Sequence, residues 1–275
     1  MKNIVSKEWL QDNLSKENII ILDVRYDMNN SDYGRLQYEE NHIPRAQFVS
    51  FDDVLVGEIK EHGGRHPLPD MYKFIEDMNK YGINHESLVV VYDDGTLEMA
   101  GRLWWMLRYA GKKEVYVLEG GIKSWKRNNF VLTNEVIKPD SLGMLILDID
   151  NSMVVDMDYV KGNSKSPSIA IVDSRAYERY IGKVEPIDKI PGHIPNAINY
   201  PWTNLLENEQ LFLYKELTEY FHELEEFQEI IVHCGSGITG TVNVMAMDEI
   251  GLKPKLYVGG YSDWISYSDN KIAKE

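Results

Sequence analysis

The sequence predicts an α/β protein made of two tandem domains, each with a mostly parallel sheet that helices cover on both faces. Short β-branched runs alternate with longer segments of helical periodicity, which is typical of parallel sheets between helices. The chain also matches itself at an offset of roughly 140 to 150 residues. Its 275 residues suffice for two domains of ordinary size, each with a core of its own.

The internal repeat rests on four landmarks that occur in the same order in both halves. The clearest pair is "HIPRAQFV" and "HIPNAINY". The four stretches and their partners are 19–25 with 168–175, 42–49 with 193–200, 88–111 with 229–251, and 115–125 with 255–264. We therefore predict a first domain over 1–130, a connector over 131–152 and a second domain over 153–275.

Three apolar runs in each half are continuous instead of alternating, as expected for strands that are buried on both faces. They lie at 19–22, 88–92 and 115–118 in the first half, and at 168–172, 230–233 and 255–258 in the second. The connector carries Pro139 and Gly143. Its apolar middle predicts that it lies along the first domain.

Composition excludes several classes of function. A net charge of −15 and a pI near 4.9 argue against nucleic acid as a partner, because phosphate binding needs a basic face. The sequence has neither a run of about 18 apolar residues nor the apolar core of a signal peptide, so we expect a cytoplasmic protein without membrane contact. The seven histidines are scattered and no dinucleotide fingerprint is present, so we expect no metal and no cofactor.

The chain has a single cysteine, Cys234, which excludes an internal disulfide and a cysteine-built zinc site. It follows the run 230–233 and precedes a glycine-rich turn and a helix predicted over 241–250. The carboxyl end of a strand that leads into a helix is where open α/β sheets bind ligands. The equivalent residue of the first half is Asp93, an acid that indicates a polar strand end. A reactive thiol is therefore predicted, with an inert buried cysteine as the alternative.

The turn after Cys234 favours an ionised thiol. It consists of Gly235, Ser236, Gly237, Ile238, Thr239 and Gly240. Glycines let successive backbone N–H groups point toward one place, and the first helical turn adds partial positive charge there. A thiolate or an incoming anion is stabilised in such a cradle.

The residues of the same turn argue against phosphate chemistry, so we expect no release of phosphate from an aryl phosphate. A cysteine phosphatase needs an arginine six positions after its nucleophile, and that position is Gly240. A phosphate-binding P-loop needs a glycine followed by a lysine, which the turn lacks.

The motifs "CGSGITG", "VDSR", "GHIPNAINYPW", "GGYSDW" and "GGRHPLP" resemble the tandem-domain rhodanese-like sulfurtransferases over nearly the whole chain. In that family only the second domain carries the cysteine, which agrees with Asp93 and implies a non-catalytic first domain. The resemblance implies that Cys234 takes a sulfane sulfur from 3-mercaptopyruvate or thiosulfate as a persulfide. It also implies a thiophilic acceptor, either cyanide or a thiol such as that of a thioredoxin-like protein.

The donor is left open between these two molecules, with a lean toward 3-mercaptopyruvate. The neutral glycine-serine-glycine run after Cys234 resembles the mercaptopyruvate members of the family, which use the serine, here Ser236, in proton transfer. Arg179 matches one of the two arginines that bind the substrate carboxylate in those members, and the loop 235–240 forms the rest of the binding site. The second arginine position falls on Asp188, an acid that repels a carboxylate.

The resemblance also implies a first-domain histidine that lines the active-site cleft and works with an upstream aspartate. His42 and Asp32 are the candidates, and Arg65 and His66 of "GGRHPLP" line the same cleft. However, the "HIP" histidine occurs in both halves, as His42 and His193, which favours a structural role for it.

Two further interpretations complete the prediction. Arg175 has the counterpart Arg25 in the half without a thiol, so we assign it to structure. A second functional hypothesis is a non-catalytic thiol sensor or persulfide carrier that docks a partner, because no second cysteine is present to resolve an oxidised form.

Overall fold

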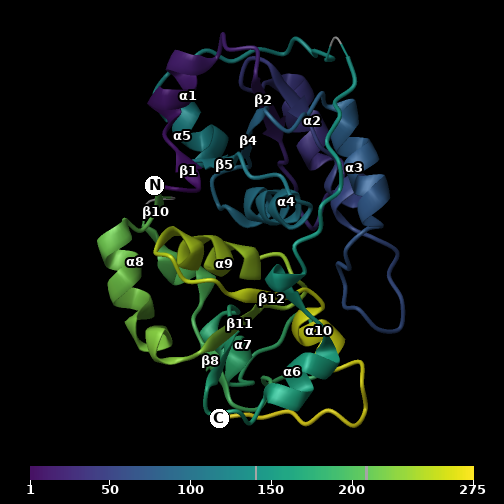
Figure 1. Ribbon diagram of the computed structural model, residues 1–275, viewed down its shortest axis with the longest axis vertical. Coiled ribbons are helices and arrows are strands. Elements are labelled where there is room, and N and C mark those ends of the chain that lie inside the picture. Colours follow the sequence, from purple (N-terminus) through teal and green to yellow (C-terminus); the bar gives the residue numbers. More distant parts are fainter. Residues whose placement is uncertain (140, 208–209) are drawn as a thin grey trace. The chain divides into compact units, whose positions relative to one another are not determined.

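The computed structural model describes residues 1–139, 141–207 and 210–275, and its internal contacts divide the chain into two compact units. The first unit contains Met1–Val56 and Leu68–Asp150, and the second contains Gly57–Pro67 and Asn151–Glu275 (Figure 1). The short segment 57–67 therefore belongs to the second unit, although it lies within the first copy of the repeat along the chain.

Each unit contains a parallel sheet of five strands, which confirms the predicted fold class. The strand order in the first unit is β1 (Ile4–Val5), β5 (Val115–Leu118), β4 (Leu88–Tyr92), β2 (Ile19–Asp23), β3 (Ala46–Phe48). In the second unit it is β6 (Val154–Val155), β12 (Lys255–Tyr257), β11 (Glu229–His233), β7 (Ile169–Asp173), β8 (Ala197–Asn199). The second unit also has a small antiparallel pair, β9 (Leu206–Glu207) and β10 (Gln210–Leu211).

Helices surround each sheet (Figure 1). Those of the first unit are α1 (Lys7–Asn13), α2 (Tyr33–Glu40), the π-helical turn η1 (Phe51–Leu55), α3 (Met71–Lys80), α4 (Glu98–Tyr109) and α5 (Gly121–Arg127). Those of the second unit are η2 (Asn151–Met153), α6 (Met157–Asn163), α7 (Tyr177–Tyr180), η3 (Trp202–Leu205), α8 (Tyr214–Phe221), η4 (His222–Glu226), α9 (Gly240–Glu249) and α10 (Gly260–Trp264).

Local chemistry explains where several helices begin and end. The side chains of Ser6, Asp70 and Asp156 accept backbone N–H groups at the first turns of α1, α3 and α6. Gly251, with φ of +90°, follows the end of α9, as the sequence predicts. α9 is buried almost all round because it packs on β11, β12 and α8.

The six predicted strands are all present as β2, β4, β5, β7, β11 and β12. The outer strands β1, β3, β6 and β8 were not predicted as strands. They contain only two or three residues, too few to show a hydrophobic period.

Both units share a buried arginine that ties a loop to the end of the unit's second strand, β2 or β7. Arg25 Nη2 donates to Asp23 Oδ2 at 2.7 Å and to the Asn41 carbonyl at 2.8 Å. Arg175 Nη2 likewise donates to Asp173 Oδ2 at 2.6 Å and to the Gly192 carbonyl at 2.7 Å. The structural role predicted for this pair is confirmed.

The repeated "HIP" histidines are also structural in both units. Nδ1 of His42 lies 2.7 Å from the Tyr38 carbonyl, and Nδ1 of His193 lies 2.8 Å from the Tyr180 carbonyl. Each ring stacks on the same tyrosine at 3.9 Å between centroids. A carbonyl oxygen only accepts hydrogen bonds, so each ring donates through Nδ1.

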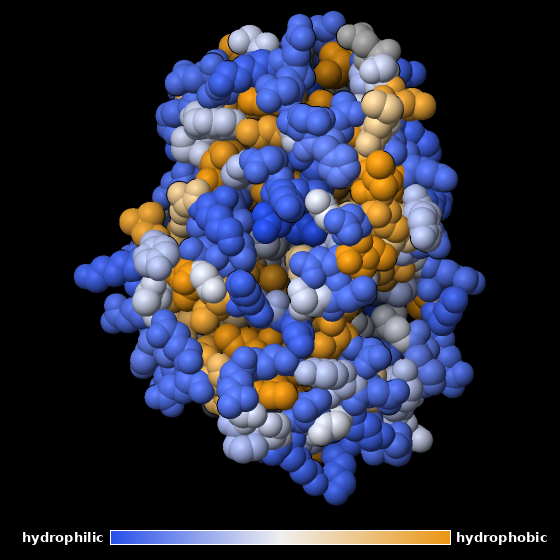
Figure 2. Space-filling view, in the orientation of Figure 1, coloured by the Kyte–Doolittle hydropathy of each residue, from blue (hydrophilic) through white to orange (hydrophobic). Residues whose placement is uncertain are grey.

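Residues 131–150 of the connector belong to the first unit, as their apolar middle predicts. Thr133 pairs with His42 through the backbone, and Leu145 is buried while Leu142, Met144 and Ile146 remain exposed. Across the part of the chain that the structure describes, none of the helices has the length and apolar character needed to cross a membrane. Hydrophilic residues predominate on the face drawn in Figure 2, in keeping with the acidic composition.

Candidate active site

Cys234 follows directly after β11, the middle strand of the second sheet, and is 2% exposed. Its carbonyl accepts from Tyr261 N at 2.8 Å, and the Gly235 carbonyl accepts from Ser262 N at 2.9 Å. Gly260, just before these donors, has φ of +61° and lies against the Cys234 carbonyl. The first turn of α10 therefore fixes the backbone that presents the thiol.

Ser236 lies two residues after Cys234 and meets a histidine from the segment 57–67. Its Oγ is 2.7 Å from His66 Nδ1. The segment is anchored on α10, because Gly63 N donates to Asp263 Oδ1 at 2.6 Å and Arg65 N donates to Ser262 Oγ at 3.2 Å. The serine hydroxyl and the imidazole thus form a pair suited to proton transfer beside the thiol loop.

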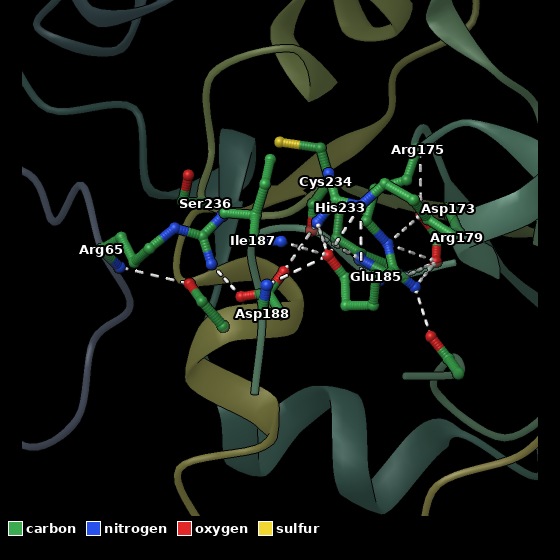
Figure 3. Close-up of polar contacts among 12 residues, drawn as sticks. Arg65, Asp173, Arg175, Arg179, Glu185, Ile187, Asp188, His233, Cys234 and Ser236 are labelled. Atoms are coloured by element: carbon green, nitrogen blue, oxygen red, sulfur yellow. Dashed lines mark hydrogen bonds and ion pairs between the residues drawn. The ribbon is translucent and has the colours of Figure 1, made fainter. Parts of the chain in front are cut away.

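Two arginines converge on Asp188 next to this loop (Figure 3). Arg179 Nη2 lies 2.8 Å from Asp188 Oδ2, and Arg65 Nη1 is paired with Asp188 Oδ1. The Asp188 side chain is only 2% exposed. The two predicted arginines are therefore brought together, and the acid at the second arginine position holds them.

Glu185 extends this cluster to the structural arginine of the second unit. It pairs with Arg179 at 2.8 Å and with Arg175 Nη1 at 3.3 Å, and it accepts the backbone N–H groups of Ile187 and Asp188. In the first unit the equivalent Nη1 of Arg25 finds no hydrogen-bond partner among the described residues. Glu185 therefore connects the Asp173–Arg175 ion pair to Arg179 beside the thiol loop, and the first unit shows no such connection at Arg25 among the described residues.

Burial sets the charge states around the site. Burial and the neighbouring Arg179 lower the pKa of Arg65, which still leaves the guanidinium charged at neutral pH. Burial also lowers the pKa of His233, so its ring is neutral and its contact of 3.8 Å with Asp173 is not an ion pair at pH 7. Burial opposes ionisation of Asp173, but His233 and Arg175 favour it and hold the pKa below its usual value. Because His233 is neutral, Arg175 is the effective partner.

In the first unit, the turn equivalent to the thiol loop holds the carboxylate of Asp93. The Asp93 carboxylate accepts backbone N–H groups from Gly95 at 2.7 Å, Ala100 at 3.2 Å and Leu97 at 3.3 Å. Burial raises the pKa of this carboxyl, and the three N–H donors oppose the rise. The strand-turn-helix of this fold therefore does direct several N–H groups at one point. For the Cys234 sulfur itself, the cradle stays a prediction.

The structure places the predicted loop residues as one turn. Gly235, Gly237, Ile238 and Gly240 are buried, Ser236 is 6% exposed, and Thr239 is half-buried at the start of α9. Thr241 Oγ1 donates to the Ile238 carbonyl at 2.6 Å, which closes the turn.

The structure contradicts the assignment of His42, whose side chain cannot line a cleft, whereas the assignment of Asp32 stays a prediction. His42 is fully buried inside the first unit, with its ring nitrogens next to the Tyr38 and Glu135 carbonyls. Asp32 has a side chain that is 66% exposed and paired with Arg35. The histidine that reaches the thiol loop is His66.

Sequence reasoning missed the carboxylates of the site. Glu185 gave no signal, because a single acid in a polar loop looks solvated, and Asp188 was interpreted only as a misplaced repulsive charge. His66 had one signal, its place beside Arg65 in "GGRHPLP".

The profile of the Rhodanese-like domain matches residues 6–128 and 156–267, and the chain belongs to this family, with two tandem domains. It is 35% identical to the probable 3-mercaptopyruvate sulfurtransferase of Pseudomonas aeruginosa, over 98% of this chain and 97% of that protein. It is 31% identical to the 3-mercaptopyruvate sulfurtransferase of Escherichia coli, over 96% and 95%.

A solved structure agrees with these relatives. The crystal structure of SseA from Escherichia coli, described as a 3-mercaptopyruvate sulfotransferase, matches with a TM-score of 0.83 at 30% identity. The match covers 95% of this chain and 100% of that one. The chain is therefore an enzyme of the sulfurtransferase class.

Proposed function

We propose that this enzyme transfers sulfur from 3-mercaptopyruvate through a persulfide on Cys234 to a thiophilic acceptor. The names of the Pseudomonas aeruginosa and Escherichia coli relatives support this donor. The observation that carries the proposal is the hydrogen bond between His66 and Ser236, the residue two positions after Cys234. Because Cys234 is the only cysteine, no other side chain of this protein offers a thiol.

The chemistry requires one proton to move. The Cys234 thiolate attacks the sulfur of 3-mercaptopyruvate, an S–S bond forms, and the C–S bond breaks with its electron pair on carbon. The leaving group is the enolate of pyruvate, and it takes the proton that the donor thiol loses. The products are the ionised persulfide and pyruvate, and the Ser236–His66 pair relays the proton between them.

The same pair argues against thiosulfate as the main donor. When thiosulfate reacts, its S–S bond breaks and sulfite leaves as a stable anion that needs no proton. Arg65 and Arg179 suit either anionic donor, but a serine-histidine relay has a task only with 3-mercaptopyruvate. The pair is therefore the feature that separates the two donors.

The acceptor half-reaction restores the enzyme. A cyanide ion or a thiolate attacks the outer sulfur of the persulfide, and Cys234 leaves as a thiolate. Cyanide yields thiocyanate and is the convenient probe. A thiol acceptor, such as a thioredoxin-like protein in the cytoplasm, yields a new persulfide.

A single-turnover experiment tests the proposal. The protein is mixed with 3-mercaptopyruvate without acceptor, pyruvate is measured, and the intact mass is recorded. We expect one pyruvate per protein and a mass increase of one sulfur atom, both absent in Cys234→Ser. Cyanide should then release thiocyanate and restore the original mass.

Steady-state rates with each donor complete the test. We expect kcat/KM to be higher with 3-mercaptopyruvate than with thiosulfate. The opposite result is a sulfur adduct that forms while the protein transfers its sulfur no faster than a small-molecule thiol does. That result would overturn catalysis and favour a persulfide carrier. Turnover that persists in Cys234→Ser would overturn the role of the cysteine.

A further inference from the structure

Asp188 occupies an unusual place beside the thiol loop. Two guanidinium groups, from Arg65 and Arg179, bind its two carboxylate oxygens. A Cβ atom placed on Gly235 would lie 2.8 Å from Arg65 Nη2 and 3.7 Å from Arg179 Nη2. Both cations therefore sit against the residue that follows Cys234, with an internal carboxylate between them (Figure 3).

The charges of this cluster are balanced. The three arginines Arg65, Arg175 and Arg179 are matched by the three buried carboxylates Asp173, Glu185 and Asp188. Asp173 and Glu185 pair with Arg175, and Glu185 also pairs with Arg179, while Asp188 is the carboxylate that forms an ion pair with Arg65 among the described residues. Removal of the Asp188 charge would leave one uncompensated positive charge at the place where two arginines can grip one anion.

We propose that the Asp188 carboxylate is a resident anion that fills the binding position of the donor's carboxylate, so that the donor must displace it. The inference rests on the proposed function, because it assigns this position to an anionic donor. The carboxylate of the donor competes with the Asp188 carboxylate for Arg65 and Arg179. The strength of the Asp188 ion pairs thereby sets the affinity of the enzyme for its donor.

An external anion has a route to this position. Arg65 and Asp188 both line a cavity of about 430 Å³ in the second unit. Lys60, Lys189 and Glu61 also line it, and all three are exposed, so the lysines outnumber the acid at its rim. Cations at the rim of a cavity raise the local concentration of anions, in an otherwise acidic protein.

Equilibrium binding of pyruvate to the two-domain protein tests the inference. Pyruvate keeps the carboxylate of the donor but lacks its sulfur, so calorimetric titration reports binding without turnover. We expect Asp188→Asn to bind pyruvate about tenfold more tightly than the wild type. Asp188→Ala, which empties the position, should bind at least as tightly. The KM for 3-mercaptopyruvate should fall in both variants.

A matched control separates occupancy from net charge. Glu185→Gln removes one negative charge from the same cluster, but among the described residues Glu185 forms ion pairs with Arg175 and Arg179 and acts on Arg65 only through longer-range electrostatics. If Asp188 is a resident anion, Glu185→Gln should not reproduce the gain in pyruvate affinity. Asp269→Asn removes an exposed charge paired with Lys161 and should change nothing. Thermal melting confirms that each variant is folded.

The outcomes distinguish the two proposals. If folded Asp188→Asn and Asp188→Ala bind pyruvate no more tightly than the wild type, the inference is wrong. It is also wrong if Glu185→Gln gives the same gain. A wild-type protein that forms no sulfur adduct on Cys234 would refute the proposed function instead, whatever its affinity for pyruvate.

Discussion

His66 Nδ1 lies 2.7 Å from Ser236 Oγ, although the two residues are 170 positions apart in the sequence. The serine belongs to the turn after Cys234, and the histidine belongs to the segment 57–67 that packs in the second unit. The fold therefore completes the thiol loop with a base taken from the first half of the chain.

If the pair relays a proton, Ser236→Ala and His66→Asn should each lower kcat with 3-mercaptopyruvate by about 10²-fold. The double variant should be no worse than the poorer single variant, because the two residues act as one unit. Rates with thiosulfate should fall much less. Steady-state kinetics with both donors provide the measurement.

The same segment offers a control for this pair. His62 Nδ1 lies 2.7 Å from Ser266 Oγ in an exposed contact, and its ring stacks on Tyr267. His62→Asn should leave both rates near those of the wild type. Equal losses with both donors would argue that Ser236 and His66 only shape the loop.

Gly260→Ala should disturb the thiol loop directly. An added Cβ would lie 2.6 Å from the Cys234 carbonyl and 3.0 Å from the Gly235 carbonyl, and the φ of +61° disfavours alanine by about 1–2 kcal/mol. We expect lower thermal stability and a clear loss of sulfur transfer well below the melting temperature.

Gly251→Ala is the matched variant for Gly260→Ala. Its φ is +90°, but an added Cβ would meet nothing within 4 Å. Its free energy of unfolding should fall by a similar amount, about 1–2 kcal/mol, because alanine also disfavours this backbone conformation, and its activity should be kept. Equal activity in the two variants would show that contact with α10 does not position Cys234.

The buried ring of His233 should make stability depend on pH. Burial lowers its pKa in the folded protein, so the unfolded chain, with a pKa near 6.5, binds a proton first as the pH falls. Acid therefore favours unfolding. Between pH 6.5 and 5 the free energy of unfolding should fall by up to about 1.4 kcal/mol per pH unit more in the wild type than in His233→Asn. Parallel slopes in denaturant titrations would mean that this ring is not the source.

Asp93 should matter for stability and not for chemistry. Asp93→Ala would leave the buried N–H groups of Gly95, Leu97 and Ala100 without their acceptor, at a cost of about 1–3 kcal/mol. Asp93→Asn should cost less, because an amide oxygen still accepts. Asp12→Ala, exposed on α1, should change little. A cost for Asp93→Ala as small as for Asp12→Ala, measured by denaturant unfolding, would mean that the amide cradle does not stabilise the turn.

The sequence by itself determined the repeated α/β fold, the six inner strands of the two sheets and the place of Cys234 at a strand end. These follow from local patterns: continuous apolar runs mark buried parallel strands, and a glycine-rich turn before a helix marks a ligand-binding strand end. The structural roles of Arg175 and His193 were also within reach, because each has a counterpart in the half without a thiol.

Only the tertiary structure decided which charged groups meet at the site. Asp188 repels a carboxylate when it is considered alone, yet in the structure it forms ion pairs with both Arg65 and Arg179. Likewise, His42 matched the expected kind of residue, but its burial leaves His66 as the partner of Ser236. Such pairings join segments that are distant in the chain, and their energy depends on burial and distance, which no local pattern encodes.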